Sequence, residues 1–235
     1  MRTPLKNLKN QTNSGSIILD LIPAGSVVDY YPIYSGELPI KISESDRFVV
    51  AHTHNYVVYE FWACVKQDPT RVSQIAEKFY PMLNENTFDI LKKNWFGYKD
   101  PFVRSALFFL LNRCSDLGMI THGNLDTKNY HAFALRDLKN FKTENLHLNL
   151  LKEKNIYDFS KNINVFNCGK YRVSFLENEK VLGEEETDMN HRELIKNNIS
   201  KKCILLFKHH PALFKLKNYD KILIDQYGKR TNDHA

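Results

Sequence analysis

The sequence contains no long apolar run and no closely spaced cysteines. Its hydrophobic stretches all fall short of the roughly 20 residues that a membrane-spanning helix needs, and the opening Met1-Arg2-Thr3-Pro4 lacks the apolar core of a signal peptide. The sequence has no Cys-x-x-Cys pair, the spacing that indicates a zinc or redox site. We expect small buried thiols in a reducing compartment at Cys64, Cys114, Cys168 and Cys203. These absences predict a cytoplasmic protein with no membrane partner.

The sequence also lacks the usual signatures of nucleotide and hydrolase sites. It has no phosphate-binding Gly-rich loop, no Gly-x-Ser-x-Gly elbow and no dinucleotide fingerprint. Histidines occur in His52-Thr53-His54 and in His209-His210, but no nearby Asp, Glu or Cys completes a metal-ligand pattern. The acidic run Glu184-Glu185-Glu186 precedes an expected helix start, where the helix dipole favours negative charge. We therefore predict hydrogen-bonded or solvent-facing histidines and no metal site.

The chain does contain enough apolar surface for one folded domain. Its 235 residues are 43% hydrophobic and 12% aromatic, which is sufficient to offset the chain entropy lost on folding. Lys and Arg number 33 against 27 Asp and Glu, a net charge of +6. This mild excess is compatible with a polyanionic partner but does not by itself indicate one. We expect one ordinary domain with an insertion, followed by a loose tail at 229–235.

The apolar pattern alternates between strands and helices. Strands are predicted at 26–31, 47–51, 146–150, 163–166, 203–208 and 221–224. Helical patterns cover 16–22, 40–45, 56–65, 68–79, 87–111, 132–140 and 190–198, and Asp68-Pro69 is a helix-opening pair. Residues 115–130, rich in Gly, Asn and Asp, are expected to form a surface loop or hairpin. This alternation predicts an α/β sheet whose helix-rich middle is an insertion.

Several short motifs follow one another in a characteristic order. Thr3-Pro4-Leu5-Lys6 precedes the first helix, a strand runs into Tyr31-Pro32-Ile33-Tyr34-Ser35-Gly36-Glu37, and the next strand runs into His52-Thr53-His54-Asn55. Leu110-Leu111-Asn112-Arg113 follows, with Gly118 shortly after it. In this order the motifs resemble those of the Dam-type DNA adenine (N6) methyltransferases, which carry Thr-Pro-Leu-Arg-Tyr-Pro-Gly-Gly-Lys, Glu-Pro-Phe-x-Gly-x-Gly, Asn-Asp-x-Asn and Phe-Leu-x-Leu-Asn-Arg. The resemblance covers roughly residues 3–228.

The resemblance implies a site for S-adenosylmethionine, and this sequence departs from the family at that site. Gln11 stands where the family has a lysine, and Thr53 replaces the ribose-binding acid. Pro32 and Gly36 are kept, but Glu37 replaces a glycine, and its side chain would project toward the methionine part of the cofactor. Tyr31 and Ser35 also replace family residues in this turn. We therefore expect a vestigial cofactor site that binds no cofactor.

The catalytic motif that the resemblance implies, Asp-Pro-Pro-Tyr, is absent. In the family the Asp accepts a hydrogen bond from the adenine amino group and the Tyr stacks on the flipped base. Here the strand at 164–166 runs into Asn167-Cys168-Gly169-Lys170-Tyr171, so only Tyr171 matches and Asn167 stands for the Asp at the expected strand end. An amide supplies no negative charge to a developing cationic amine. Asn167 and Tyr171 are thus predicted to be vestigial, and methyl transfer is not expected.

The fold that the resemblance implies is the Rossmann-like α/β fold of S-adenosylmethionine-dependent methyltransferases. This fold is a mostly parallel sheet with an antiparallel C-terminal hairpin. We expect residues 1–55 and 131–228 to form the α/β core and residues 56–130 to form a helical insertion that resembles the family's target-recognition part. The favoured function is a catalytically inactive homologue from a microbe or virus, retained for binding DNA or a protein partner or assembly. The alternatives are an active site-specific adenine methyltransferase with an unusual pocket and a structural subunit that reuses the fold.

The expected insertion has a basic bias that suits contacts with DNA phosphates. Its basic residues include Lys99, Arg104 and Arg136, and the four that we predict to contact DNA are Lys92, Lys93, Arg113 and Lys128. Scattered solvated side chains on helix faces explain the same composition equally well. DNA binding and protein binding therefore both stay open at this point.

Overall fold

The protein folds around a five-stranded parallel sheet. Its structure is a computed structural model that describes residues 2–6, 15–152, 162–170, 195, 202–208, 213, 215, 217–225, 227 and 229–231. The sheet has the order β3-β2-β1-β4-β5. Its strands are β1 (Val27–Tyr31), β2 (Phe48–Thr53), β3 (Leu146–Leu150), β4 (Ile163–Lys170) and β5 (Cys203–Lys208), all paired in parallel. The α/β, Rossmann-like architecture predicted from the sequence is confirmed.

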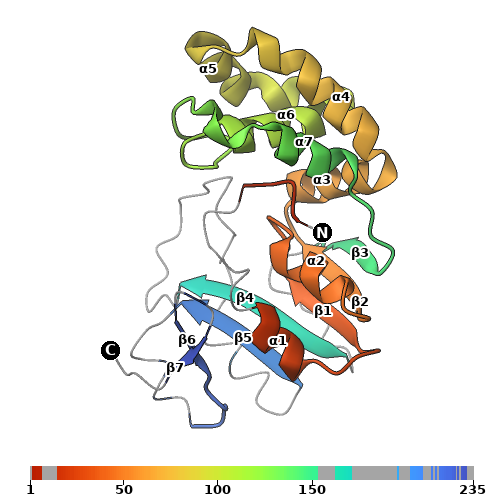
Figure 1. The fold of residues 1–235 in the computed structure, drawn as a ribbon, viewed down its shortest axis with the longest axis vertical. Coiled ribbons are helices and arrows are strands. Elements are labelled where there is room, and N and C mark those ends of the chain that lie inside the picture. The colour runs from red at the N-terminus through yellow and green to blue at the C-terminus, as the bar shows by residue number, and fades with distance from the viewer. Residues whose placement is uncertain are drawn as a thin grey trace.

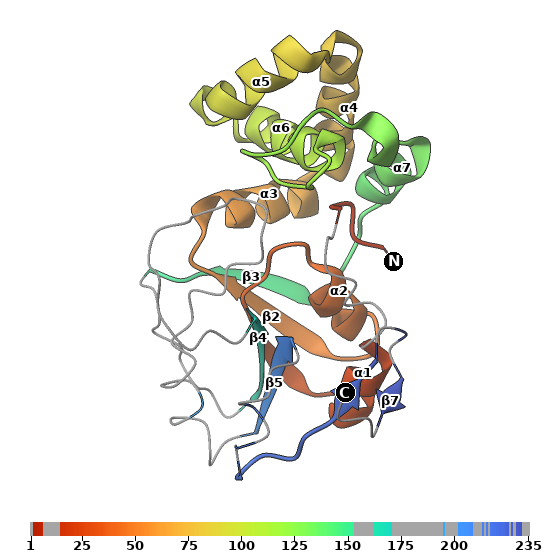
Figure 2. The same cartoon turned by 90° about the vertical axis from the view of Figure 1, so that its left-hand side faces the viewer.

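Helices form a layer on the sheet and a separate group beyond it. The short helices α1 (Gly15–Leu21) and α2 (Glu37–Ser43) lie beside the sheet, with α2 packed on β2 and β3 (Figure 1). The helical part is inserted between β2 and β3 and comprises α3 (Tyr56–Gln67), α4 (Pro69–Phe79), α5 (Glu85–Asn94), α6 (Pro101–Cys114) and α7 (Ala132–Lys139). Since α7 packs on α4, the helical part extends past the expected boundary at residue 130 (Figure 2).

Local capping explains where the inserted helices begin. Asp68 accepts a hydrogen bond from the backbone of Arg71 (2.9 Å), so the predicted opening of α4 at Pro69 is confirmed. The helical pattern predicted over 87–111 is instead divided into two helices, because Asp100 caps a new helix and Pro101 occupies its first position. A proline at that position cannot continue a preceding helix. Short 3₁₀ turns at Tyr80–Met82, Trp95–Gly97 and Thr127–Asn129 complete the helical part.

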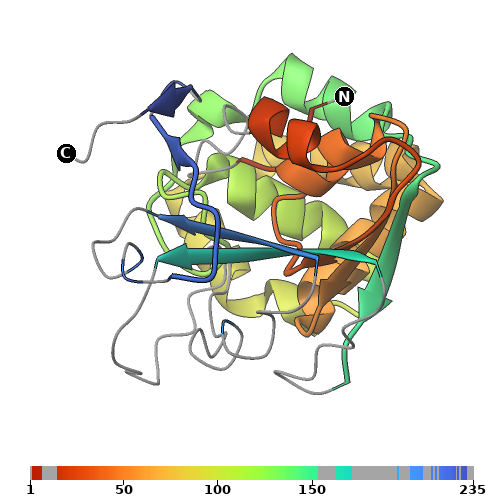
Figure 3. The same cartoon turned by 90° about the horizontal axis from the view of Figure 1, so that it is seen from below.

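The two faces of the sheet carry different residues. In β1, Val28 and Tyr30 belong to the large core that α1, α2 and α3 also line, and Figure 3 shows α1 and α2 over that face. Tyr31 faces the other way, where it packs with Phe166 and Cys168 in a second, smaller core. Strand alternation places Asp29 on the same face as Tyr31. A buried carboxylate therefore lies on the smaller-core side of the central strand.

The C-terminal half departs from expectation in two places. Strand β4 extends to Lys170, with a register shift between Asn167 and Gly169, so Asn167 lies within the strand and not at its end as we predicted. The expected antiparallel hairpin is present as β6 (Leu223–Ile224) and β7 (Arg230–Thr231), but it forms a sheet of its own and includes residues assigned to the tail. Apart from Ile195, the helix expected at 190–198 lies outside the described residues.

None of the helices that the structure describes has the length and apolar character required to cross a membrane.

Candidate functional site

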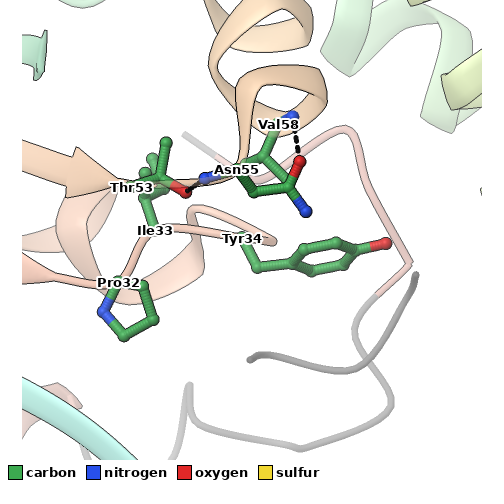
Figure 4. A pocket seen from close by; sticks show the side chains of 6 residues that line it. All are labelled: Pro32, Ile33, Tyr34, Thr53, Asn55 and Val58. Atoms are coloured by element: carbon green, nitrogen blue, oxygen red, sulfur yellow. Dashed lines mark hydrogen bonds between the residues drawn. The ribbon is translucent and has the colours of Figure 1, made fainter. Parts of the chain in front are cut away.

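A small hollow lies where β1 and β2 end. It is lined by Pro32, Ile33, Tyr34, Thr53, Asn55 and Val58, and its empty space is about 190 Å³, including the part open to solvent (Figure 4). In parallel α/β sheets, ligands bind outside the carboxyl ends of the strands, at the point where the strand order reverses. Here that point lies between β1 and β4. The hollow lies at the same edge of the sheet, at the neighbouring ends of β1 and β2; it is the candidate site and contains two of the predicted cofactor residues, Pro32 and Thr53.

The turn that follows β1 is held closely against the rest of the protein. The indole nitrogen of Trp62 donates to the carbonyl of Tyr34 (2.8 Å), and the Thr3 hydroxyl donates to the carbonyl of Ser35. Gly36 has a φ of +74°, and a Cβ atom there would overlap the Trp62 ring, with Cη2 only 2.7 Å away. The fully buried Trp62 thus packs directly against Gly36, one of the predicted cofactor residues.

Polar groups around the hollow are used to start α3. The Thr53 hydroxyl accepts from the backbone of Asn55 (3.1 Å), and the Asn55 side chain accepts from Val57 (3.0 Å) and Val58 (3.5 Å). Figure 4 shows the Tyr34 ring lying below Asn55 and pointing away from Pro32. Glu37, the first residue of α2, is half-buried and does not line the hollow. Of the predicted cofactor set, the structure brings Pro32 and Thr53 together and places Gly36 and Glu37 beside them.

A polar network centred on the buried side chains of Asp29 and His52 crosses the sheet. Asn149 donates to Nδ1 of His52 (3.0 Å), which leaves Nε2 of His52 to donate to Asp29 (2.8 Å), and Asn162 donates to the other oxygen of Asp29 (2.9 Å). The Tyr31 ring is stacked between His52 (4.2 Å between centroids) and Phe166 (4.9 Å). From the sequence we expected His52 to be hydrogen-bonded or solvent-facing; it is buried and hydrogen-bonded, and the role of Asp29 was missed. An acidic residue inside an apolar strand was the available signal.

The predicted catalytic residues are only partly described. Asn167 is 1% exposed and lies in β4 next to Phe166, which pairs with the last residue of β1. Tyr171 and Gln11 lie outside the described residues, as do His209, His210 and the acidic run at 184–186. Within the described ranges, no group of three or more His, Cys, Asp or Glu side chains is placed to hold a metal ion.

Two of the four predicted DNA contacts are bonded within the protein. Lys92 donates to the carbonyl of Gly123 (2.7 Å) and pairs with Asp89 (2.8 Å). Arg113 donates to the carbonyl of Pro4 (2.6 Å), and burial lowers its pKa to about 10, a value that leaves it charged at neutral pH. Lys93 and Lys128 are exposed, and no described residue hydrogen-bonds their ammonium groups; the same holds for Lys99.

Two of the motifs that carry the family resemblance contact each other. The Asn112 side chain accepts from the backbone of Lys6 (2.6 Å) and donates to the carbonyls of Lys6 (3.3 Å) and Gly118 (2.7 Å). Together with Arg113 it fastens the Thr3–Lys6 segment to the end of α6. The likeness at these two places therefore reflects one contact between the N-terminal segment and the helical part.

The chain matches no model of a known protein family, and no curated protein matches it in sequence.

Proposed function

We propose that this protein is a non-catalytic relative of the DNA adenine methyltransferases that has kept the binding of DNA. The observation that carries the proposal is the closely packed turn after β1. In the family this turn approaches the cofactor. Here the Trp62 ring packs against Gly36 and its indole nitrogen donates to the carbonyl of Tyr34, while the Thr3 hydroxyl donates to the carbonyl of Ser35. The hollow beside this turn is small and partly open to solvent, and it is lined by Pro32, Thr53 and Asn55 among others.

The chemistry of the polar groups supports the absence of methyl transfer. S-adenosylmethionine would need an acceptor for its ribose hydroxyls at Thr53, where the family has a carboxylate. The Thr53 hydroxyl accepts from the backbone of Asn55, which leaves it one lone pair in place of the acceptors of a carboxylate. Asn167, the residue that the resemblance sets against the family's catalytic Asp, is a neutral amide buried within a strand and not at its end. The described residues therefore fit the cofactor poorly, and we derive no methyl-transfer step for this protein.

Exposed basic side chains in the helical part support the binding of DNA. Lys93, Lys99 and Lys128 extend from α5, from the segment after it and from the turn at Thr127–Asn129. Lysines without a carboxylate partner are free to neutralise phosphates, which is the main source of sequence-independent affinity for DNA. Lys92, Arg104 and Arg113 are excluded from this role in the proposal because each is bonded inside the protein.

The proposal is tested by measuring affinity for a DNA duplex at several salt concentrations. We expect weak, sequence-independent binding that falls steeply with salt, and replacement of Lys93 and Lys128 by Ala should lower the salt slope by roughly one per lysine. Lys221→Ala, an exposed change in the C-terminal hairpin, is the matched control. Salt-independent binding, or no binding at low salt, would contradict the proposal and favour a protein partner.

A further inference from the structure

Three exposed aromatic residues in the helical part contact Glu60 or Arg104, which form an ion pair. Tyr56, the first residue of α3, is 50% exposed, Phe96 is 54% exposed and Tyr98 is 39% exposed. Single exposed hydrophobic side chains are common on proteins, but a group of aromatic rings on one surface indicates a binding role. We call Tyr56, Phe96 and Tyr98 the aromatic patch.

An ion pair between Glu60 and Arg104 contacts all three residues of the aromatic patch. Nε of Arg104 donates to one oxygen of Glu60 (2.7 Å), and a second guanidinium nitrogen donates to the other. The guanidinium also donates to the carbonyl of Tyr98 (2.5 Å) and lies 5.8 Å from the centre of the Phe96 ring. The Tyr56 hydroxyl donates to Glu60 (2.9 Å), which raises the pKa of Tyr56 and keeps the phenol protonated. All three aromatic residues are thus tied to one Glu60–Arg104 pair.

Ring contacts hold two of the aromatic side chains in place. Phe96 makes a T-shaped contact with the buried Trp95 (5.7 Å between centroids), and Tyr98 makes one with Phe79 (6.1 Å). These contacts restrict the rings while more than a third of each residue stays exposed. A pre-ordered ring loses little conformational entropy when a planar ligand stacks on it.

The charge around the aromatic patch is positive. Lys93 and Lys99 are exposed beside Phe96 and Tyr98, and the Lys99 backbone bonds Arg104 directly (3.0 Å). Nearby carboxylates are already paired: Glu60 with Arg104, Asp89 with Lys92 (2.8 Å) and Asp100 with Arg71 (2.8 Å). The surface therefore offers aromatic rings together with two exposed ammonium groups that form no ion pair within the described residues, which complements a ligand with flat apolar faces and negative charge.

We propose that the aromatic patch binds single-stranded DNA, with unpaired bases stacked on Tyr56, Phe96 and Tyr98 and the backbone phosphates beside Lys93 and Lys99. Surfaces that combine aromatic rings with positive charge bind single strands in this way, with little preference for sequence. A duplex hides the faces of its bases, so it can contact the lysines but not the rings. The inference rests on the proposed binding of DNA and specifies the form of DNA that this surface prefers.

The experiment compares a labelled single strand with its duplex by fluorescence anisotropy at low salt. The double variant Phe96→Ala/Tyr98→Ala should weaken single-strand binding about tenfold or more, since stacking on one ring contributes about that factor, and should leave duplex binding within about twofold. Phe96→Leu keeps the apolar volume without a planar ring, and it should reproduce part of the loss even if the double variant folds poorly. Phe133→Ala, which removes an exposed ring on α7, is the control.

The outcomes separate this inference from the proposed function. If the protein binds the duplex but the aromatic variants leave single-strand binding unchanged, the stacking inference is wrong and the proposed function stands. Equal losses for single strand and duplex would also overturn it, because a duplex offers no base faces to the rings. If neither form of DNA binds to the unmodified protein at low salt, both the inference and the proposed function fail.

Discussion

Among single residues, Asp29 and His52 form the buried polar contact at the centre of the sheet. Both are less than 7% exposed, and they lie on adjacent strands with Asn149 and Asn162 at the two ends of the network. A buried carboxylate is costly unless it is hydrogen-bonded, so the imidazole compensates for the burial of Asp29. The contact is therefore a condition for the sheet to pack, independently of any ligand.

Replacing His52 by Leu should destabilise the protein by about 3 kcal/mol, because it leaves the Asp29 carboxylate without its imidazole. Urea unfolding measures this change. His147→Leu, an exposed histidine on β3 that stacks on Phe48, is the control and should cost less than about 1 kcal/mol. Equal effects of the two changes would show that Asp29 does not depend on His52.

The four thiols should be slow to react in the folded protein. Burial raises the pKa of Cys114 and of Cys203 to about 12, from an ordinary value of 9.0, and raises the pKa values of Cys64 and Cys168 as well. Only the thiolate reacts, and at pH 8 a thiol with a pKa of about 12 is about a thousandth as ionised as an ordinary one. A thiol-reactive dye should therefore label the native protein slowly and all four cysteines after unfolding in urea. One thiol that reacts at the rate of free cysteine in the native protein would contradict this.

At the scale of elements, the turn between β1 and α2 is the part most sensitive to change. Gly36→Ala combines an unfavourable positive φ with overlap of the buried Trp62 ring, and we expect a loss of more than about 3 kcal/mol. Gly25→Ala has a similar φ of +72° but open space around the new methyl, so it should cost about 1 kcal/mol. Gly97→Ala has neither feature and should be near neutral.

Thermal or urea unfolding of the three variants measures these losses of stability. We expect the largest loss for Gly36→Ala, a smaller one for Gly25→Ala and the smallest for Gly97→Ala. If Gly36→Ala cost no more than Gly25→Ala, the turn would have room for a side chain and the packing described here would be wrong. That result would also weaken the proposal that protein atoms fill the cofactor position.

The sequence predicted the elements of the sheet better than their ends. The strands at 146–150 and 203–208 were placed correctly, because their apolar residues are flanked by polar ones. Strand β4 was predicted too short, since Asn167 was interpreted as a strand end; the register shift at Asn167 lets pairing with β5 continue through Lys170. The break at Asp100-Pro101 was missed because the apolar pattern runs through it on both sides.

At the scale of the whole molecule, Arg113 and Asn112 join the N-terminal segment to the helical part. Arg113→Ala removes hydrogen bonds to the carbonyls of Pro4 and Thr3 and should cost about 2 kcal/mol in unfolding experiments. The affinity of the folded variant for duplex DNA should equal that of the unmodified protein, because the Arg113 guanidinium is already hydrogen-bonded inside the unmodified protein. Arg136→Ala, an exposed arginine on α7, is the control and should be neutral in stability. A stable Arg113→Ala protein with weakened DNA binding would return Arg113 to the DNA contacts.

The candidate site was harder to predict than the fold, for a physical reason. Pro32 and Thr53 were named from the family resemblance, and the parallel pairing of β1 with β2 brings the ends of these strands together. Lys92 donates a hydrogen bond to Gly123 and Arg113 donates one to Pro4. Both bonds join segments that are distant in the sequence, so the pattern of charges along the chain does not predict them. The aromatic patch was missed for the same reason, because Tyr56 and Phe96 are far apart in the sequence and are linked in the fold through the Glu60–Arg104 pair.

Isothermal titration calorimetry of the whole protein with S-adenosylmethionine is the sharpest test of the proposed loss of the cofactor site. We expect no saturable heat and no thermal stabilisation, because Trp62 packs against Gly36 in the turn after β1 and Thr53 offers the ribose hydroxyls no carboxylate. Ligand at 100 times its dissociation constant would stabilise a binding protein by about 2.7 kcal/mol, so binding of ordinary strength would be evident. Saturable heat with a matching rise in melting temperature would contradict the claim and favour an active methyltransferase.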